Sequence, residues 1–113
     1  MLSSRRELSA TPGALLAAID RYESCLAPDL SAETFLQQTR DSFEEVRLGA
    51  AAFAPQSALW VEVLITRFEV LEALLKSSDG RRTIRTQALL KTHREHLERL
   101  RGICRSELDR GLT

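Results

Sequence analysis

Apolar residues recur along this chain at the three- and four-residue spacing of helices, and residues that start or stop helices divide the pattern into four stretches. Thr11 before Pro12 is typical of a helix start, whereas Pro28 and Gly49 are typical of the ends of the first and second stretches. The pattern predicts helices over about residues 13–26, 32–48, 57–77 and 82–110.

The third stretch is the most hydrophobic. Its apolar residues cover an arc of roughly 240° on a helical wheel, whereas a surface helix needs an apolar stripe of only ~100°. The arc contains Leu59, Trp60, Val61, Val63, Leu64, Ile65, Phe68, Val70, Leu71, Leu74 and Leu75. Thr66 falls on the polar side, and Arg67 falls inside the arc, where we expect it to reach a carboxylate or the edge of an interface. Because three other helices in one chain leave part of this arc uncovered, we expect a homodimer.

The fourth stretch carries a seam like that of a coiled coil. Its apolar positions alternate at intervals of three and four residues, at Leu90, His93, Leu97, Leu100 and Cys104. A helix of this length is longer than a small bundle is wide, so we expect part of its basic surface to project beyond the domain or to lie along a second copy.

Composition agrees with an all-α fold. The chain has 113 residues, of which 43% are hydrophobic and 28% charged, and only 5 Gly and 3 Pro are available for turns. We therefore predict a compact bundle of about four helices with a long basic C-terminal helix. Residues 1–10 have no sustained period, so we expect a flexible N-terminal tail followed by a single helical domain over 11–113.

No secretory signal pattern precedes the helices, so we expect a cytoplasmic protein in which Cys25 and Cys104 are reduced thiols packed among apolar neighbours. The most apolar stretch is interrupted by Glu62, Glu69 and other charged residues. Charges so close together are costly in a bilayer, and we predict no membrane span.

Charge is divided unequally along the chain. Residues 1–80 contain 7 Lys and Arg against 12 Asp and Glu, whereas residues 81–113 contain 9 against 4. The formal net charge of zero therefore conceals an acidic part of −5 and a basic part of +5. Such a division is typical of a chain that docks a partner.

Catalytic and metal-binding patterns are weak. His93 and His96 lie three residues apart with Cys104 further on, but zinc sites gather three or four ligands with supporting carboxylates. We therefore interpret the histidines as packed or solvated side chains. Catalysis by a cysteine would need a neighbouring base and a lowered thiol pKa, and neither cysteine lies in a helix-start or Cys-x-x-Cys context. No Gly-rich phosphate loop or catalytic triad context is found. We predict no enzyme activity, no metal and no cofactor.

Two alternatives to a protein-binding regulator stay open. The basic helix could contact phosphates, but acidic residues interleave with its arginines and it has no aromatic residue for stacking on bases, so we expect nucleic-acid binding to be the lesser role. A secretion-chaperone-like adaptor is the other alternative, with its client segment along the apolar arc of the third helix.

The chain resembles the small bacterial quorum-sensing anti-activators of the QslA kind. The resemblance covers the length, the helical organisation and the Arg-rich, Ala/Leu-rich character of the whole chain, with Leu59-Trp60-Val61-Glu62-Val63-Leu64-Ile65 as its most distinctive segment. It implies a homodimer that sequesters a LuxR-type transcription regulator and prevents that regulator from dimerising and binding DNA.

We predict two groups of contact residues on this basis. Large apolar side chains on the third helix are expected to anchor a partner, with Arg67 beside them; these are Trp60, Leu64, Phe68 and Leu71. Basic residues of the fourth helix are expected to steer an acidic partner; these are Arg94, Arg101 and Arg105.

Overall fold

A computed structural model describes residues 11–26, 31–53, 58–76 and 84–111 and folds them into helices without any strand. The helices are α2 (Pro12–Ser24), α3 (Ala32–Phe53), α4 (Ala58–Lys76) and α5 (Ile84–Gly111). The predicted all-α bundle is confirmed, and the helix bounds differ from the predicted ones mostly by two residues or fewer. The expected tail, residues 1–10, lies outside the described residues.

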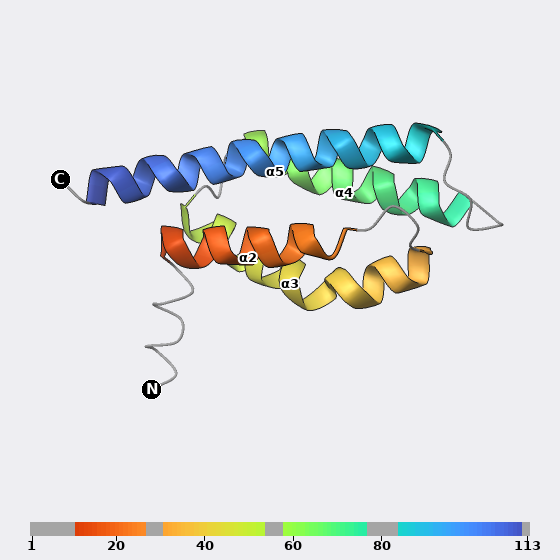
Figure 1. Ribbon diagram of the computed structural model, residues 1–113, viewed down its shortest axis with the longest axis horizontal. Helices are drawn as coiled ribbons and strands as arrows, with labels where there is room; N and C mark the ends of the chain where they lie inside the picture. Colours follow the sequence, from red (N-terminus) through yellow and green to blue (C-terminus); the bar gives the residue numbers. More distant parts are fainter. Residues whose placement is uncertain (1–10, 27–30, 54–57, 77–83, 112–113) are drawn as a thin grey trace.

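The helices form a bundle with one loosely packed side. In Figure 1, α5 lies along the top, α4 lies behind it, and α2 and α3 lie below. α2 packs against both α3 and α5, and α4 packs mainly against α5, whereas α3 and α4 share few contacts. The C-terminal turns of α5 extend past the other described helices, as the length of its seam predicted (Figure 1).

Polar side chains fix the starts of α2 and α3. The Thr11 hydroxyl accepts a hydrogen bond from the backbone N–H of Ala14 at 3.0 Å, and Pro12 occupies the first turn, where its missing N–H costs nothing. The Ser31 hydroxyl accepts from the backbone N–H of Thr34 at 3.2 Å. These caps satisfy N–H groups that have no partner within the helix.

The predicted end of the second helix is wrong. α3 continues through Gly49 to Phe53, because Gly49 is buried where α3 crosses α2 and the alanines after it are good helix formers. A Cβ atom at position 49 would lie 2.8 Å from Cδ1 of Leu15 and 3.2 Å from its Cβ. The glycine therefore allows two helices to approach closely and does not terminate one of them.

The predicted seam of α5 is confirmed as the centre of the core. Leu90, His93, Leu97, Leu100 and Cys104 are all buried, and they face large buried side chains from the other helices. The core residues that surround them include Ile19, Tyr22, Phe35, Val46, Val63 and Val70. Both cysteines are free thiols, and burial raises the pKa of the Cys104 thiol.

A chain of hydrogen bonds through His93 crosses this core. The Nε2 atom of His93 lies 2.8 Å from the Tyr22 hydroxyl of α2, and its Nδ1 atom lies 2.8 Å from the Thr66 hydroxyl of α4. The Thr66 hydroxyl also lies 2.9 Å from the carbonyl oxygen of Glu62, to which it donates. The Thr66 hydroxyl therefore accepts a hydrogen bond from the Nδ1–H group of His93, and Nε2 of His93 accepts one from the Tyr22 hydroxyl. A ring with one donor nitrogen and one acceptor nitrogen is a neutral imidazole. Thr66, predicted on the polar side of its helix, is buried because it meets this histidine.

The burial of His93 makes stability depend on pH. Burial, with Arg67 nearby, lowers the pKa of His93 from 6.5 to about 3, so below pH 6.5 the unfolded chain takes up a proton that the folded chain does not. The stabilising contribution is complete above pH 6.5 and is lost as the pH falls toward 3. We expect the contribution of His93 to make the free energy of unfolding about 2 kcal/mol lower at pH 5 than at pH 7, as measured by urea denaturation.

A His93→Gln variant provides the control, because its side chain keeps polar atoms in the core but does not titrate. Its free energy of unfolding should change much less between pH 7 and pH 5, with circular dichroism confirming that the variant is helical. Equal pH dependence in the two proteins would contradict the assignment of the effect to His93.

Candidate partner-binding groove between α3 and α4

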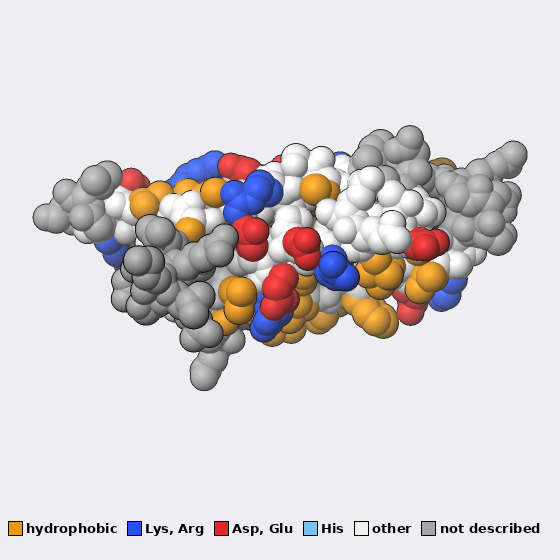
Figure 2. Space-filling view, turned by 90° about the horizontal axis from the view of Figure 1, so that it is seen from below, with side chains coloured by type: hydrophobic (Ala, Val, Ile, Leu, Met, Phe, Trp, Pro, Cys, Tyr) orange, Lys and Arg blue, Asp and Glu red, His pale blue; other side chains and the backbone are white. Residues whose placement is uncertain are grey.

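One side of α4 carries large apolar side chains that the described chain leaves partly or largely exposed. We call this set the apolar row; it consists of Val61, Leu64, Ile65, Phe68, Leu71 and Leu75. The exposed fraction reaches 66% for Phe68 and 67% for Leu75. In Figure 2, which views the molecule from below Figure 1, hydrophobic side chains lie along the lower edge. An exposed apolar patch of this kind is typical of an interaction surface.

The apolar row repeats with the spacing of a coiled-coil seam. Val61, Leu64, Phe68, Leu71 and Leu75 follow one another at intervals of three, four, three and four residues. The other apolar side of α4 is buried in the core, chiefly through Trp60, Val63, Val70 and Leu74. The wide apolar arc predicted from the sequence thus divides into one side that the described chain covers and one side that it leaves open.

The apolar row borders an open groove where α3 and α4 diverge. Leu36 and Phe43 contribute from α3, and α4 contributes Arg67 and three members of the apolar row: Leu64, Phe68 and Leu71. The groove has a volume of about 230 Å³. This volume is comparable to that of one or two apolar side chains, so the groove and the row together have the form of a helix-in-groove surface.

Arg67 forms one wall of the groove without a carboxylate partner in the described part of the chain. Its guanidinium carbon lies 4.3 Å from the centre of the Phe43 ring, 5.2 Å from that of Phe35 and 5.8 Å from that of Tyr22. The ring faces stabilise the positive charge where no carboxylate of the described chain does so, and of the two expected placements of Arg67, beside a carboxylate or at the edge of an interface, the position on the groove is compatible with the second. Its Nη1 atom is buried and has no hydrogen-bond partner among the described residues.

Trp60 is placed differently from its predicted role as an exposed anchor. Its side chain is 7% exposed, and its ring stacks on Phe43 with the ring centres 5.8 Å apart. Phe43 in turn packs on Tyr22 at 5.0 Å. Trp60 therefore holds α4 against the core, and we leave it out of the contact surface.

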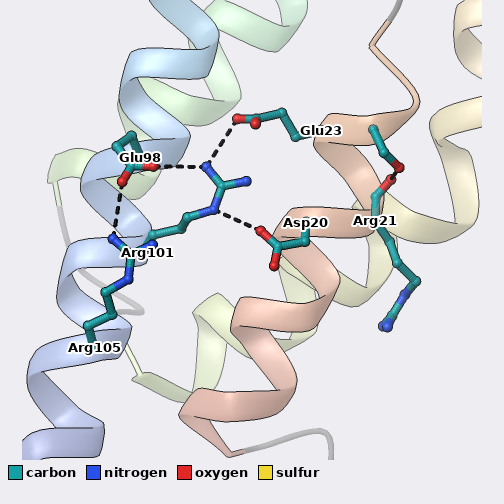
Figure 3. Close-up of polar contacts among 7 residues, drawn as sticks. Asp20, Arg21, Glu23, Glu98, Arg101 and Arg105 are labelled. Carbon is teal, nitrogen blue, oxygen red and sulfur yellow. Dashed lines mark hydrogen bonds and ion pairs between the residues drawn. The ribbon is translucent and has the colours of Figure 1, made fainter.

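Arg101, predicted to steer a partner, instead joins α5 to α2. Its side chain is only 9% exposed, and it donates to Asp20 at 2.9 Å, to Glu23 at 3.1 Å and to Glu98 at 3.0 Å. Figure 3 shows the guanidinium pointing from α5 toward the two carboxylates of α2. A nearly buried cation with three carboxylates has a structural role in this bundle.

The other two predicted steering residues are also used within the chain. Arg94 donates from Nη2 to the backbone carbonyl oxygen of Leu26 at 2.6 Å. Arg105 donates to Glu98 at 3.1 Å, and hydrogen bonds from Arg105 and Arg101 lower the pKa of the Glu98 carboxyl. The Glu98 carboxylate offsets part of the charge of Arg105, whereas Arg94 keeps its charge and is held in place by the carbonyl of Leu26.

Sequence patterns did not indicate Leu36 and Phe43 as walls of the groove, and they did not distinguish Val61, Ile65 and Leu75 from the core residues of α4. The sequence did contain one indication of this surface: α4 has two series of apolar residues at heptad spacing, one of which is buried in the core and the other of which forms the apolar row. Because both series are apolar, nothing on α4 alone indicates which of them faces α5.

Among the described residues, no three His, Cys, Asp or Glu side chains converge as metal ligands, and both ring nitrogens of His93 are hydrogen-bonded. The helices of the described part include none long and apolar enough to cross a bilayer.

Comparison with known proteins adds no assignment: the chain matches no protein-family model, no curated protein and no solved structure.

The placement of Arg101 predicts that this residue stabilises the fold. Arg101→Met removes three charge-assisted hydrogen bonds from a nearly buried position, and we expect the free energy of unfolding to fall by about 2 kcal/mol. Arg105→Met is the matched control on the same helix, and because Arg105 is exposed the loss should be at most about 0.5 kcal/mol. Urea denaturation measures both values, and equal losses would contradict the structural role of Arg101.

Proposed function

We propose that this chain is a non-enzymatic protein-binding regulator that docks a helix of another protein on the apolar row and in the adjoining groove. The observation that carries the proposal is the heptad-spaced exposure of the apolar row on a helix whose other side is already buried. A single exposed leucine is ordinary on a protein surface, whereas a series that follows one side of a helix over four turns matches the contacts of a second helix.

The dimensions and chemistry of the surface favour a helical partner. The groove beside Phe68 accepts bulky apolar side chains, and the walls provided by Leu36 and Leu71 leave few polar groups to satisfy. An amphipathic helix with apolar residues at positions i, i+3, i+4 and i+7 would bury them against this surface while its own backbone hydrogen bonds stay intact.

The form of regulation that we propose is anti-activation. The bacterial anti-activators that the sequence resembles mask the dimerisation surface of a LuxR-type transcription regulator, and an apolar docking surface suits such a target. By occupying the helix that the regulator uses to dimerise, the chain would prevent the regulator from binding DNA. Because three arginines of α5 are engaged within the chain, we base the proposal on the apolar surface and assign no steering role to them.

The proposal predicts that Phe68 is essential for partner capture and dispensable for folding. Phe68→Glu places a charge in the middle of the apolar row, while the 66% exposure of Phe68 means that little core packing is lost. We expect the affinity for the partner to fall by at least about 100-fold, as for a central hot-spot residue. Leu108→Glu, on an exposed position of α5, is the matched control and should retain binding.

The measurement has two steps, with circular dichroism verifying the helix content of each variant. Partners captured from a bacterial lysate by the wild type and by Leu108→Glu, but lost with Phe68→Glu, are identified by mass spectrometry. The purified partner is then tested for DNA binding with and without the chain. A captured transcription regulator that loses DNA binding supports anti-activation, whereas capture that is indifferent to Phe68→Glu contradicts docking on the apolar row.

A further inference from the structure

We propose that the groove between α3 and α4 binds a small amphipathic acid: a compact apolar body fills the groove, and its single carboxylate pairs with Arg67. Two features of the groove carry the proposal. One is its apolar lining, and the other is a guanidinium whose charge no carboxylate of the described chain neutralises. Binding of an acid is separate from the docking of a helix, although both would use the same groove.

The groove is apolar apart from Arg67. Its remaining walls are the side chains of Leu36, Phe43, Leu64, Phe68 and Leu71. At the packing density of protein interiors, its volume of about 230 Å³ holds roughly eight to ten carbon atoms. A drug-sized molecule needs more room, whereas a short alkyl chain fills this space without leaving polar groups to satisfy. The apolar part of the ligand is therefore small.

Arg67 has no acidic neighbour at the positions of α4 where an intrahelical ion pair forms. The residues three and four positions to either side of it are apolar; they are Val63, Leu64, Val70 and Leu71. Glu69 lies two residues further along, which places it about 200° from Arg67 around the helix. The helix that carries this cation therefore leaves its charge without a counter-ion.

Most carboxylates on the two helices that form the groove are engaged with other cations. These pairs join Glu45 to Arg21, Asp41 to Arg40, Glu44 to Arg47 and Glu72 to Lys76. No ion pair among the described residues includes Arg67, and its buried Nη1 atom has no hydrogen-bond partner among them. The rest of the side chain is partly exposed and lines the groove. Because a partly buried cation is stabilised by a counter-ion, this position favours an anion.

One cation in an apolar groove favours a carboxylate over a phosphate. A carboxylate brings one negative charge and two oxygens that match the fork of a guanidinium. A phosphate group would bring about two negative charges and three acceptor oxygens, for which the apolar walls provide no donors. Arg40, which continues the stripe of Leu36 and Phe43 along α3, pairs only with the highly exposed Asp41 among the described residues, so it disfavours a cationic ligand at the rim.

A bound acid would compete with a docked helix, because both fill the space beside Phe68. The chain would then release its partner when the acid is abundant, and the two ligands would weaken one another's binding by the same factor. This consequence rests on the proposed function, whereas the binding of the acid does not.

Octanoate is the probe that tests the proposal, and Trp60 provides the readout. Trp60 is the only tryptophan of the chain, and it stacks on Phe43, a wall of the groove. A ligand in the groove should therefore change the fluorescence of Trp60, and isothermal titration calorimetry measures the affinity. We expect octanoate to bind with a dissociation constant below about 1 mM, which is reasonable for a ligand of this size. Octanol, with the same chain and no charge, should bind at least about tenfold more weakly, and octylammonium should not bind.

Arg67→Met tests the role of the charge, because it keeps a long apolar side chain and removes the guanidinium. The affinity for octanoate should fall at least about tenfold, while that for octanol changes less than about twofold, so the preference for the acid is lost. A loss of packing alone would weaken both ligands equally. Arg99→Met, at an exposed position of α5, is the matched control and should keep the wild-type preference. Circular dichroism confirms the helix content of both variants, and the comparison of the three ligands on the wild type needs no variant.

Equal affinities of the wild type for octanoate and octanol would overturn the proposal, and so would the absence of octanoate binding at millimolar concentrations. A preference for octanoate that survives in a folded Arg67→Met variant would overturn it as well. If octanoate does not bind but partner capture depends on Phe68, the acid site is wrong and the docking function stands. If octanoate binds in an Arg67-dependent manner and no Phe68-dependent partner is captured, the acid site stands and the proposed function is wrong.

Discussion

The fold depends on one buried imidazole that three helices share. His93 belongs to α5, and its two ring nitrogens meet a hydroxyl of α2 and a hydroxyl of α4. Satisfying both nitrogens requires these helices to have one lengthwise register, because a shift by one turn would leave a polar ring unpaired among apolar side chains. The hydrophobic seam supplies most of the driving force for packing, and the hydrogen bonds select one arrangement among those that an apolar seam allows.

α4 is the element in which folding and recognition overlap. It uses one apolar side to complete the core with α5, and Arg67, at the border between its two sides, lies against the aromatic rings of α2 and α3. The second apolar side does not pack in the core, so a large side chain such as Phe68 can be exposed there without weakening the core. This separation of the two sides allows a contact surface to be formed by a rigid helix, whose side chains need little ordering when a partner binds.

The sequence predicted the number, approximate bounds and main seam of the helices because apolar spacing, caps and prolines act locally. It failed at Gly49, where the reason for the glycine is the nearby Leu15 of another helix. It also failed to separate Trp60, which is buried, from Phe68, which is exposed, since both lie in one apolar arc. Arg101 was placed on a steering surface for a similar reason: the carboxylates that hold it belong to α2, distant in the sequence. What sequence patterns omit in each case is the identity of the neighbouring helix.

The sparse contact between α3 and α4 gives the molecule an adjustable width. Because α2 is packed on α3, α4 is packed on α5, and the two pairs meet mainly where α2 touches α5, the bundle is two helical hairpins joined along one line. A rotation about that line would change the width of the groove without disturbing the Gly49 and His93 contacts, and its range is limited by the stack of Phe43 on Trp60 and by the contact of Arg67 with the Phe43 ring, which both cross from α3 to α4. The bundle could therefore accept side chains of different size by a hinge motion that leaves the hydrogen bonds of the core intact.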